Sequence, residues 1–404
     1  MDPTPLSDAK SRLAAEIDRR AGLLVDVSHQ IHAHPETNYQ ERFAHDLLTG
    51  VLEGEGLAVT RSARGVETAF EAEAGESGPR IAVVCEYDAL PGIGHACGHN
   101  VIAAAGLGAG LAAAALAGEL GGRVVVVGSP AEEGGGGKIR LIDGGTFSDV
   151  DAALMVHPAD ADLTAMDVVA LHQAEVTYTG EAAHAAAAPH RGRNALDAAV
   201  LGYVNVAALR QHIEPGERLH GIITHGGDRP NIVPALARAE WIIRSPTVAG
   251  LEVLRHRFLD CLRAGAAAAG CEMDVRWTEP VYADMIDNQA IVERYRANAR
   301  ALGRVVCPPS RAGRVVGSTD MGNVSYAVPS IHPMIRVAPP GVPIHTPAFA
   351  GFAAGPEGDQ AVLDGAKALA FTVADLWLDA GLVGRARDEL DGVLAGRSAA
   401  AATP

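Results

Sequence analysis

Short, continuous apolar runs alternate along the first part of this chain with longer segments in which apolar residues recur every three or four positions. The runs at 81–85, 124–127 and 152–156 have the length of buried strands. The segments between them have the period of helices, and strands separated by helices are typical of an α/β protein. The pattern therefore predicts a central mixed sheet flanked by helices.

The N-terminal segment has the pattern of one amphipathic helix. Ser7 can cap it, apolar residues from Leu13 to Ile31 recur at helical spacing, and Pro35 ends it. This segment lacks the apolar core of a secretory signal. A second apolar stretch, at 101–117, is rich in Ala and Gly and falls short of the roughly 20 residues that a membrane span needs. We expect it to form a buried helix.

The pattern changes at about Leu171. From there the order is strand, helix, strand, strand, helix, strand, with helical patterns at 194–212 and 250–270. This is the order of a ferredoxin-like α+β sandwich. If His345, in the last third, joins the earlier candidate ligands, the small domain is an insertion. We therefore expect a split catalytic domain at 1–170 and 285–395, an inserted domain at 171–284 and a disordered tail at 396–404.

Charge and cysteine content exclude several classes of partner. The chain of 404 residues has 33 Lys and Arg against 49 Asp and Glu, a formal net charge of -16. Such a surface repels nucleic acid and anionic membranes, so we expect neither as a partner. The five cysteines are scattered without a disulfide-like spacing. We expect a cytoplasmic protein whose thiols stay reduced.

Candidate chemistry follows the strand-like runs. One Gly separates Cys97 from His99, and Glu132 and Glu133 are adjacent just after the second run. Thiolate, imidazole and carboxylate can bind a metal, and the second Glu can activate water, which together outline a metallohydrolase. Each has a plainer interpretation. Cys97 alone is more often a core residue, the Glu pair alone is more often a solvated loop, and His157 can be a core histidine.

Three other enzyme classes are disfavoured. The glycine run at 134–137 with Lys138 lacks the Ser or Thr and the first Gly of a phosphate loop. Gly106 to Gly110 lacks the spacing of a dinucleotide fingerprint and lies inside a helical pattern. The chain also lacks the Gly-x-Ser-x-Gly motif of serine hydrolases.

Several segments together resemble the peptidase M20 family of dinuclear metallohydrolases. They occur in the family's order over about residues 25–370, and they are His32–Glu36, Tyr87–Pro91, His95–His99, Pro130–Gly134, Ala183–Ala185 and Gly317–Gly322. Within the family the chain is most similar to the amidohydrolase subfamily. Asn100 stands where many of its members carry Asp, which resembles the aminobenzoyl-glutamate hydrolase and dipeptidase branch.

The resemblance implies a metal site. Two divalent ions per subunit are implied, zinc first with manganese or cobalt as alternatives. Cys97 would bridge the two ions, Glu132 would be the general base, and Asp88 would orient a ligand from behind. The implied ligands are Cys97, His99, Glu133, His157 and His345, although His345 could equally be a loop residue.

The resemblance also implies that the inserted domain is a lid that pairs two subunits, giving a homodimer or a dimer of dimers. His184 would reach the partner's site, and Asn231 and Arg244 would hold the substrate, although a loop cap and a surface ion pair are the plainer interpretations. The implied reaction is hydrolysis of the amide bond of an N-acyl or N-aroyl amino acid, an amino-acid conjugate or a small dipeptide with a free carboxylate. Alternatives are a dipeptidase or carboxypeptidase of this family, or a non-catalytic metal-dependent binding protein.

Overall fold

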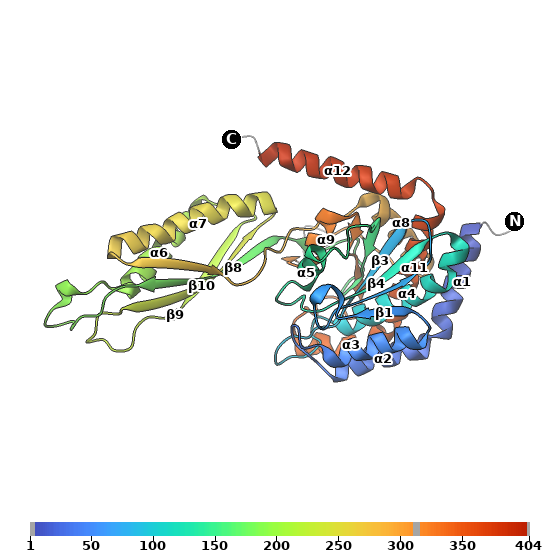
Figure 1. Ribbon diagram of the computed structural model, residues 1–404, viewed down its shortest axis with the longest axis horizontal. Coiled ribbons are helices and arrows are strands. Elements are labelled where there is room, and N and C mark those ends of the chain that lie inside the picture. Colours follow the sequence, from blue (N-terminus) through green and yellow to red (C-terminus); the bar gives the residue numbers. More distant parts are fainter. Residues whose placement is uncertain (1–4, 310–315, 402–404) are drawn as a thin grey trace. The chain divides into compact units, whose positions relative to one another are not determined.

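The computed structural model describes residues 5–309 and 316–401. The chain divides into two compact units, of which the first falls within Met1–Asp167 and Met285–Pro404 and the second is Val168–Asp284. In Figure 1 the first unit is coloured blue to green and orange to red, and the second is green to yellow. The chain leaves the first unit after Asp167 and returns to it at Met285.

Strands and helices alternate in the first unit. Its strands are β1 (Ala58–Arg61), β2 (Phe70–Ala74), β3 (Arg80–Glu86), β4 (Arg123–Ser129), β5 (Ala152–Leu154), β6 (His157–Ala159), β12 (Val316–Gly317), β13 (Ser330–Ile331) and β14 (Met334–Arg336). Its helices are α1 (Pro5–Arg19), α2 (Ala21–Ala33), α3 (Arg42–Gly54), α4 (His99–Leu120), α5 (Gly137–Asp143), α8 (Gln289–Ala301), α9 (Met321–Ala327), α10 (Pro347–Ala353), α11 (Pro356–Leu378), α12 (Leu382–Ala401) and the 3₁₀ helix η1 (Ala63–Gly65). Strand β7 (Asp167–Val168) lies where the chain passes to the second unit.

Six strands of the first unit form one mixed sheet in the order β1-β2-β4-β3-β5-β13. β3 is parallel to β4 and β5, whereas β2 is antiparallel to β4. Side chains of β3 alternate between two apolar cores, with Ile81 and Val83 in one and Ala82 and Val84 in the other. Because both faces are covered, the strand is a continuous apolar run. The predicted α/β fold with a central mixed sheet is confirmed.

Helix α4 is buried between the sheet and helices α1, α2 and α11. A Cβ at Gly106 would lie 2.8 Å from the Val84 carbonyl oxygen, so only glycine allows this close approach to β3. Among the described helices, α4 alone is long and apolar enough to cross a membrane, and 83% of its apolar window is buried. Such burial is typical of a core helix in a soluble protein.

The second unit has the element order β-α-β-β-α-β. Its elements are β8 (Ala170–Thr179), α6 (Ala195–Leu209), β9 (Arg218–His225), β10 (Leu236–Ser245), α7 (Val248–Ala269) and β11 (Glu272–Trp277), with the 3₁₀ helices η2 (Pro189–Arg191) and η3 (Arg210–His212). The four strands form an antiparallel sheet in the order β11-β8-β10-β9. Both helices lie on one face, where Val176, Trp241 and Phe258 share a core (Figure 1). This unit therefore has a core of its own.

Two sequence expectations about helices are wrong. The predicted N-terminal helix is two helices, with Ser7 inside the first, and the chain turns at Arg20, whose guanidinium pairs with Glu55 at 2.7 Å. The predicted disorder from residue 396 is also wrong, because α12 continues to Ala401 and the Arg397 guanidinium lies over the Tyr326 ring, 5.4 Å from its centre. Residues 402–404 lie outside the described residues.

Candidate metal centre and active site

The five predicted metal ligands all lie in the first unit, near the ends of its strands. His99 begins α4 and His157 begins β6, whereas Glu133 follows β4 and His345 follows β14. Gly98 has φ 80°, and a Cβ there would lie 2.9 Å from Pro158 Cγ. This glycine therefore allows the tight turn that joins Cys97 to His99.

The five side chains converge on one place. Cys97 Sγ lies 3.4 Å from His157 Nε2, and Glu133 Oε1 lies 3.3 Å from His345 Nε2 and 3.9 Å from His99 Nε2. The donor atoms of Cys97, His99 and His157 lie within 4.8 Å of one another, and so do those of Cys97, Glu133 and His345. Two sets of three donors therefore share the Cys97 sulfur.

The donor set fits divalent metal ions. His99 Nε2 is buried without a hydrogen-bond partner among the described residues, and buried polar atoms in proteins are nearly always paired. His157 Nδ1 lies 2.8 Å from the Pro158 carbonyl oxygen, so its Nε2 is the nitrogen that faces Cys97. One sulfur, three imidazoles and a carboxylate are ligands that zinc takes in proteins. The same residues would be sufficient to hold two divalent ions.

Asp88 contacts two of these five residues, His99 and Glu133. Its Oδ1 lies 3.0 Å from His99 Nδ1, and its Oδ2 accepts a hydrogen bond from the Glu133 amide at 2.9 Å. Burial alone would raise the pKa of Asp88, but the charge and hydrogen bond of His99 lower it below the ordinary value. An ionised Asp88 keeps the hydrogen of His99 on Nδ1, which turns Nε2 towards the other donors.

Glu132 adjoins the same centre. Its Oε2 lies 3.9 Å from His99 Nε2. Ala131 before it has φ 57° and donates its amide hydrogen to Glu41 Oε1 at 3.0 Å, which fixes a sharp turn after β4. Burial, then the charges of Glu86 and Glu133, raise the pKa of Glu132 well above its ordinary value. A carboxylate with such surroundings is suited to take up a proton.

Three buried residues around this centre were not assigned from the sequence. Lys138 Nζ pairs with Glu86 and lies 2.7 Å from Asp320 Oδ1. His332 packs edge-on against His157, with ring centres 5.4 Å apart. Glu86, Lys138 and His332 come from separate parts of the chain with no shared spacing, so only the fold brings them together. Asp320 lies in Gly317–Gly322, one of the segments that resemble the family in sequence.

In the second unit, the structure brings His184 and Asn231 together. The amide of Ala185, the residue after His184, donates to the Asn231 carbonyl oxygen at 3.0 Å. His184 is exposed, and its Nδ1 accepts hydrogen bonds from the amides of Ala186 and Ala187, each at 3.2 Å. In a neutral ring this leaves Nε2 as the hydrogen donor. His184 can therefore offer one hydrogen bond outside its own loop.

Arg244 lies apart from His184 and Asn231. Leu236 at the start of β10 pairs with Thr179, beside the His184 loop, whereas Arg244 pairs with Leu171 at the far end. Eight residue steps of extended strand separate Leu236 from Arg244, about 26 Å. The three residues therefore cannot contact one small molecule within one copy of this unit.

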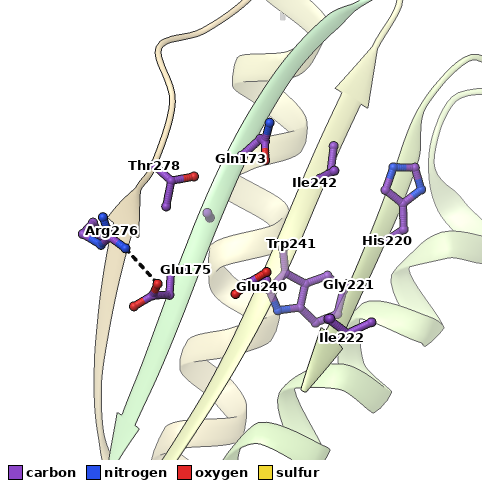
Figure 2. Close-up of a pocket in the computed structure, with 11 residues that line it drawn as sticks. Gln173, Glu175, His220, Gly221, Ile222, Glu240, Trp241, Ile242, Arg276 and Thr278 are labelled. Atoms are coloured by element: carbon purple, nitrogen blue, oxygen red, sulfur yellow. Dashed lines mark hydrogen bonds and ion pairs between the residues drawn. The ribbon is translucent and has the colours of Figure 1, made fainter. Parts of the chain in front are cut away.

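The open face of the second unit's sheet is hollowed. The hollow has a volume of about 560 Å³ and is lined by polar and apolar side chains that include Gln173, Glu175, His220, Ile222, Glu240 and Arg276 (Figure 2). Arg276 pairs with Glu175 at 2.8 Å. Its described lining does not include His184, Asn231 or Arg244. The hollow is therefore separate from the residues expected to bind substrate.

Residues 82–371 match the model of a family described as Peptidase family M20/M25/M40. The chain belongs to this family. The resemblance seen in the sequence is confirmed, and so is the prediction of a hydrolase that acts on amide bonds. The family is generally dinuclear and metal-dependent, in agreement with the donor sets described above.

Two curated relatives cover nearly the whole chain. An Xaa-Arg dipeptidase of Mus musculus is 40% identical over 395 residues, which are 94% of this chain and 91% of the relative. One of the p-aminobenzoyl-glutamate hydrolase chains of Escherichia coli is 30% identical over 449 aligned positions, 93% of each chain.

Solved structures share the fold. A putative aminohydrolase from Staphylococcus aureus superposes with a TM-score of 0.75 at 20% identity, covering 91% of this chain and 99% of that one. A dinuclear metal binding peptidase of the M20 family from Bacillus subtilis superposes with a TM-score of 0.68 at 19% identity, covering 88% and 98%.

Proposed function

We propose that this protein is a dinuclear metal amidohydrolase that cleaves a dipeptide or an N-acyl or N-aroyl amino acid. The observation that carries the proposal is the pair of donor sets that share Cys97, with the carboxylate of Glu132 beside them. An Xaa-Arg dipeptidase and a p-aminobenzoyl-glutamate hydrolase are both among its relatives. The substrates in those names share an amide bond next to an amino acid, which supports both substrate classes.

Cys97, His99, Glu133, His157 and His345 would hold the two ions, with zinc suited to this set and manganese or cobalt as alternatives. When bound, such ions polarise the scissile carbonyl and lower the pKa of water. Glu132 takes the proton from the attacking water and delivers it to the leaving nitrogen, because the C–N bond breaks readily only when nitrogen leaves as a neutral amine. Asp88 keeps His99 Nε2 directed at the centre.

The second unit would act as a lid and a dimerisation domain. His184 would supply a hydrogen bond to the oxyanion in the partner's site, with Asn231 beside it, and Arg244 would bind the substrate carboxylate. The separation of Arg244 from His184 supports a shared site, because two copies are needed to bring both ends of the sheet to one substrate. We infer a homodimer or a dimer of dimers.

Exposed apolar residues on two elements of the second unit would be available for such pairing. Val200 and Val204 of α6 are 43% and 56% exposed, and Ile222 of the edge strand β9 is 62% exposed. An edge strand with exposed apolar side chains can pair with a second copy. Val204→Glu with Ile222→Glu should give a monomer in analytical ultracentrifugation. Val253→Glu, a change at another exposed valine on α7, is the control.

A reducing cytoplasm is the compartment we propose. All five cysteines are free, and the buried Cys97 must stay reduced to bind metal. The net charge of -16 gives no attraction to nucleic acid or anionic membranes.

The test is turnover by metal-loaded protein on a panel of Xaa-Arg dipeptides, other dipeptides, N-acyl amino acids and p-aminobenzoyl-glutamate. We expect hydrolysis that a chelator abolishes and added metal restores. C-terminal carboxamide analogues are the matched substrates for the free carboxylate, and they should be turned over poorly. Full activity of protein shown to be metal-free would overturn the proposal. Binding of a dipeptide without hydrolysis would identify a binding protein instead.

A further inference from the structure

Lys138 is a fully buried cation in a group of carboxylates beside the proposed metal centre. Its Nζ pairs with Glu86 and with Asp320 Oδ1, the latter at 2.7 Å. Its amide also donates to Asp320 Oδ2 at 2.8 Å. A Cβ at the preceding Gly137 would lie 1.8 Å from the Pro130 carbonyl oxygen, so the chain here is packed tightly against the turn that carries Glu132. The two carboxylates therefore hold the ammonium of Lys138, and the close packing at Gly137 holds its backbone.

The carboxylates around Lys138 have the arrangement of a cation site. Oxygen atoms of Glu86, Glu132 and Asp320 lie within 4.8 Å of one another, and all three residues are buried. Groups of carboxylate oxygens are the ligands of hard divalent cations. Glu86 Oε2 lies 3.7 Å from His99 Nε2, so this oxygen group adjoins the proposed metal pair.

A buried group of carboxylates needs a compensating positive charge. In this group the charge is an ammonium that belongs to the chain, so it cannot be lost or exchanged as an ion can. Here the ammonium donates a hydrogen bond to Asp320 Oδ1 and forms an ion pair with Glu86, but unlike a metal ion it coordinates no carboxylate oxygen. Glu132 could not serve as a general base if its oxygens were bound to an ion.

We propose that Lys138 is a positioning residue that occupies a cation position formed by Glu86, Asp320 and Glu132, and so prevents a third divalent ion from binding there. This keeps Glu132 free of metal and directed at the substrate side of the centre. The inference rests on the two-metal function proposed above.

The test is the number of metal ions per chain in Lys138→Met, measured by elemental analysis after equilibration with manganese and removal of excess. Wild-type protein should hold about two ions per chain, and Lys138→Met about three. Lys138→Arg, which keeps the charge, should hold the wild-type number. In manganese-soaked crystals of Lys138→Met, anomalous scattering should place the added ion between Glu86 and Asp320.

Kinetics give a second measurement. Lys138→Met should lose about 100-fold in kcat, within the range for removal of a general base, while KM changes little. Adding Asp320→Asn to Lys138→Met removes one ligand, so the double variant should lose the added ion. If Lys138→Met is not recovered folded, the same measurements are made on Lys138→Gln, because its amide can still donate hydrogen bonds but has no charge.

A folded variant without the Lys138 charge that holds only the wild-type number of ions would overturn the inference, since the ammonium would then be only a structural ion-pair partner. That outcome is distinct from failure of the proposed function. Wild-type protein that binds no divalent ion would sink the two-metal proposal whatever the variant does.

Discussion

Glu132 and Glu133 are adjacent in the sequence and both lie 3.9 Å from His99 Nε2, but their other neighbours differ. Glu133 Oε1 lies 3.3 Å from His345 Nε2, and its amide is bound by Asp88. Glu132 lies close to Glu86 and Asp320 instead. At the scale of single residues, the turn after β4 therefore gives the two carboxylates different surroundings, which agrees with the ligand role proposed for Glu133 and the base role proposed for Glu132.

Glu132→Gln should lower kcat by roughly 10²–10⁴-fold with metal content near that of the wild type, because the amide keeps the shape but cannot accept a proton. Glu133→Gln should lower metal content, since it removes a ligand charge. Elemental analysis and steady-state kinetics on the same preparations check both. Near wild-type kcat in Glu132→Gln would rule out its role as the base.

Asp287 is a buried carboxyl of the first unit that is not a member of the donor sets. Burial, then the nearby charge of Asp167, raise its pKa to about 7, against a hydrogen bond from the His332 backbone that lowers it. Its Oδ1 has no hydrogen-bond partner among the described residues. The folded protein therefore keeps a proton on Asp287 at pH values where the unfolded chain has released it.

Because the folded pKa is raised, the stability that Asp287 contributes is complete below the ordinary pKa of 3.8 and is lost as pH rises through about 7. Asp287→Asn removes this titration. Relative to wild type, the variant should gain on the order of 2 kcal/mol in unfolding free energy between pH 5 and pH 8. Urea unfolding at the two pH values measures the gain, and an unchanged difference between the proteins would contradict the prediction.

At the scale of elements, the close packing of α4 on the sheet depends on glycine. A Cβ at Gly106 would meet Cys85 Sγ at 2.7 Å and the Val84 carbonyl oxygen at 2.8 Å, whereas a Cβ at Gly118 of the same helix would meet nothing within 4 Å. The first position faces the sheet, and the second is exposed.

Gly106→Ala should lower the unfolding free energy by about 1–3 kcal/mol, because the backbone of β3 must move away. Gly118→Ala is the matched control and should raise the unfolding free energy by up to about 1 kcal/mol, because alanine favours helix. Urea unfolding followed by circular dichroism compares them. Equal stability of the two variants would mean that α4 does not depend on close contact with β3.

These elements also show what the sequence could and could not predict. The elements β3, β4 and α4 can be predicted from their continuous apolar runs, because a strand or helix covered on all sides has no polar face. At the break, Arg20 pairs with Glu55, the C-cap residue of α3, and local periodicity contains no sign of such a contact. The group of Glu86, Lys138 and Asp320 joins residues far apart in the chain, and only the fold places them together.

At the scale of the whole molecule, the residues proposed to bind substrate lie at opposite ends of the second unit. Asn231 lies beside the His184 loop, whereas Arg244 lies at the other end of β10. If His184 acts in the partner's site, a heterodimer of two inactive variants should contain one intact site.

Mixing His184→Ala with Glu132→Gln under subunit exchange should therefore restore part of the activity. His184→Ala alone should cost roughly 3–4 kcal/mol of transition-state stabilisation, the range for loss of one oxyanion donor. Mass spectrometry confirms that heterodimers have formed. Heterodimers without activity would count against a shared site, and exchange of each variant with itself is the control.

The burial of α4 depends on a helix that is synthesised much later. α4 packs against α11, with Gly108 directly facing Ala366, yet α11 begins only at Pro356, after the entire second unit has been translated. At about 5–20 residues per second, a ribosome needs on the order of ten seconds to a minute to cover that interval. During this time the nascent chain carries a completed apolar helix whose partner α11 is not yet made. The second unit, which has its own core, can fold in the meantime, whereas the side of α4 that faces α11 stays uncovered until the last helices leave the exit tunnel.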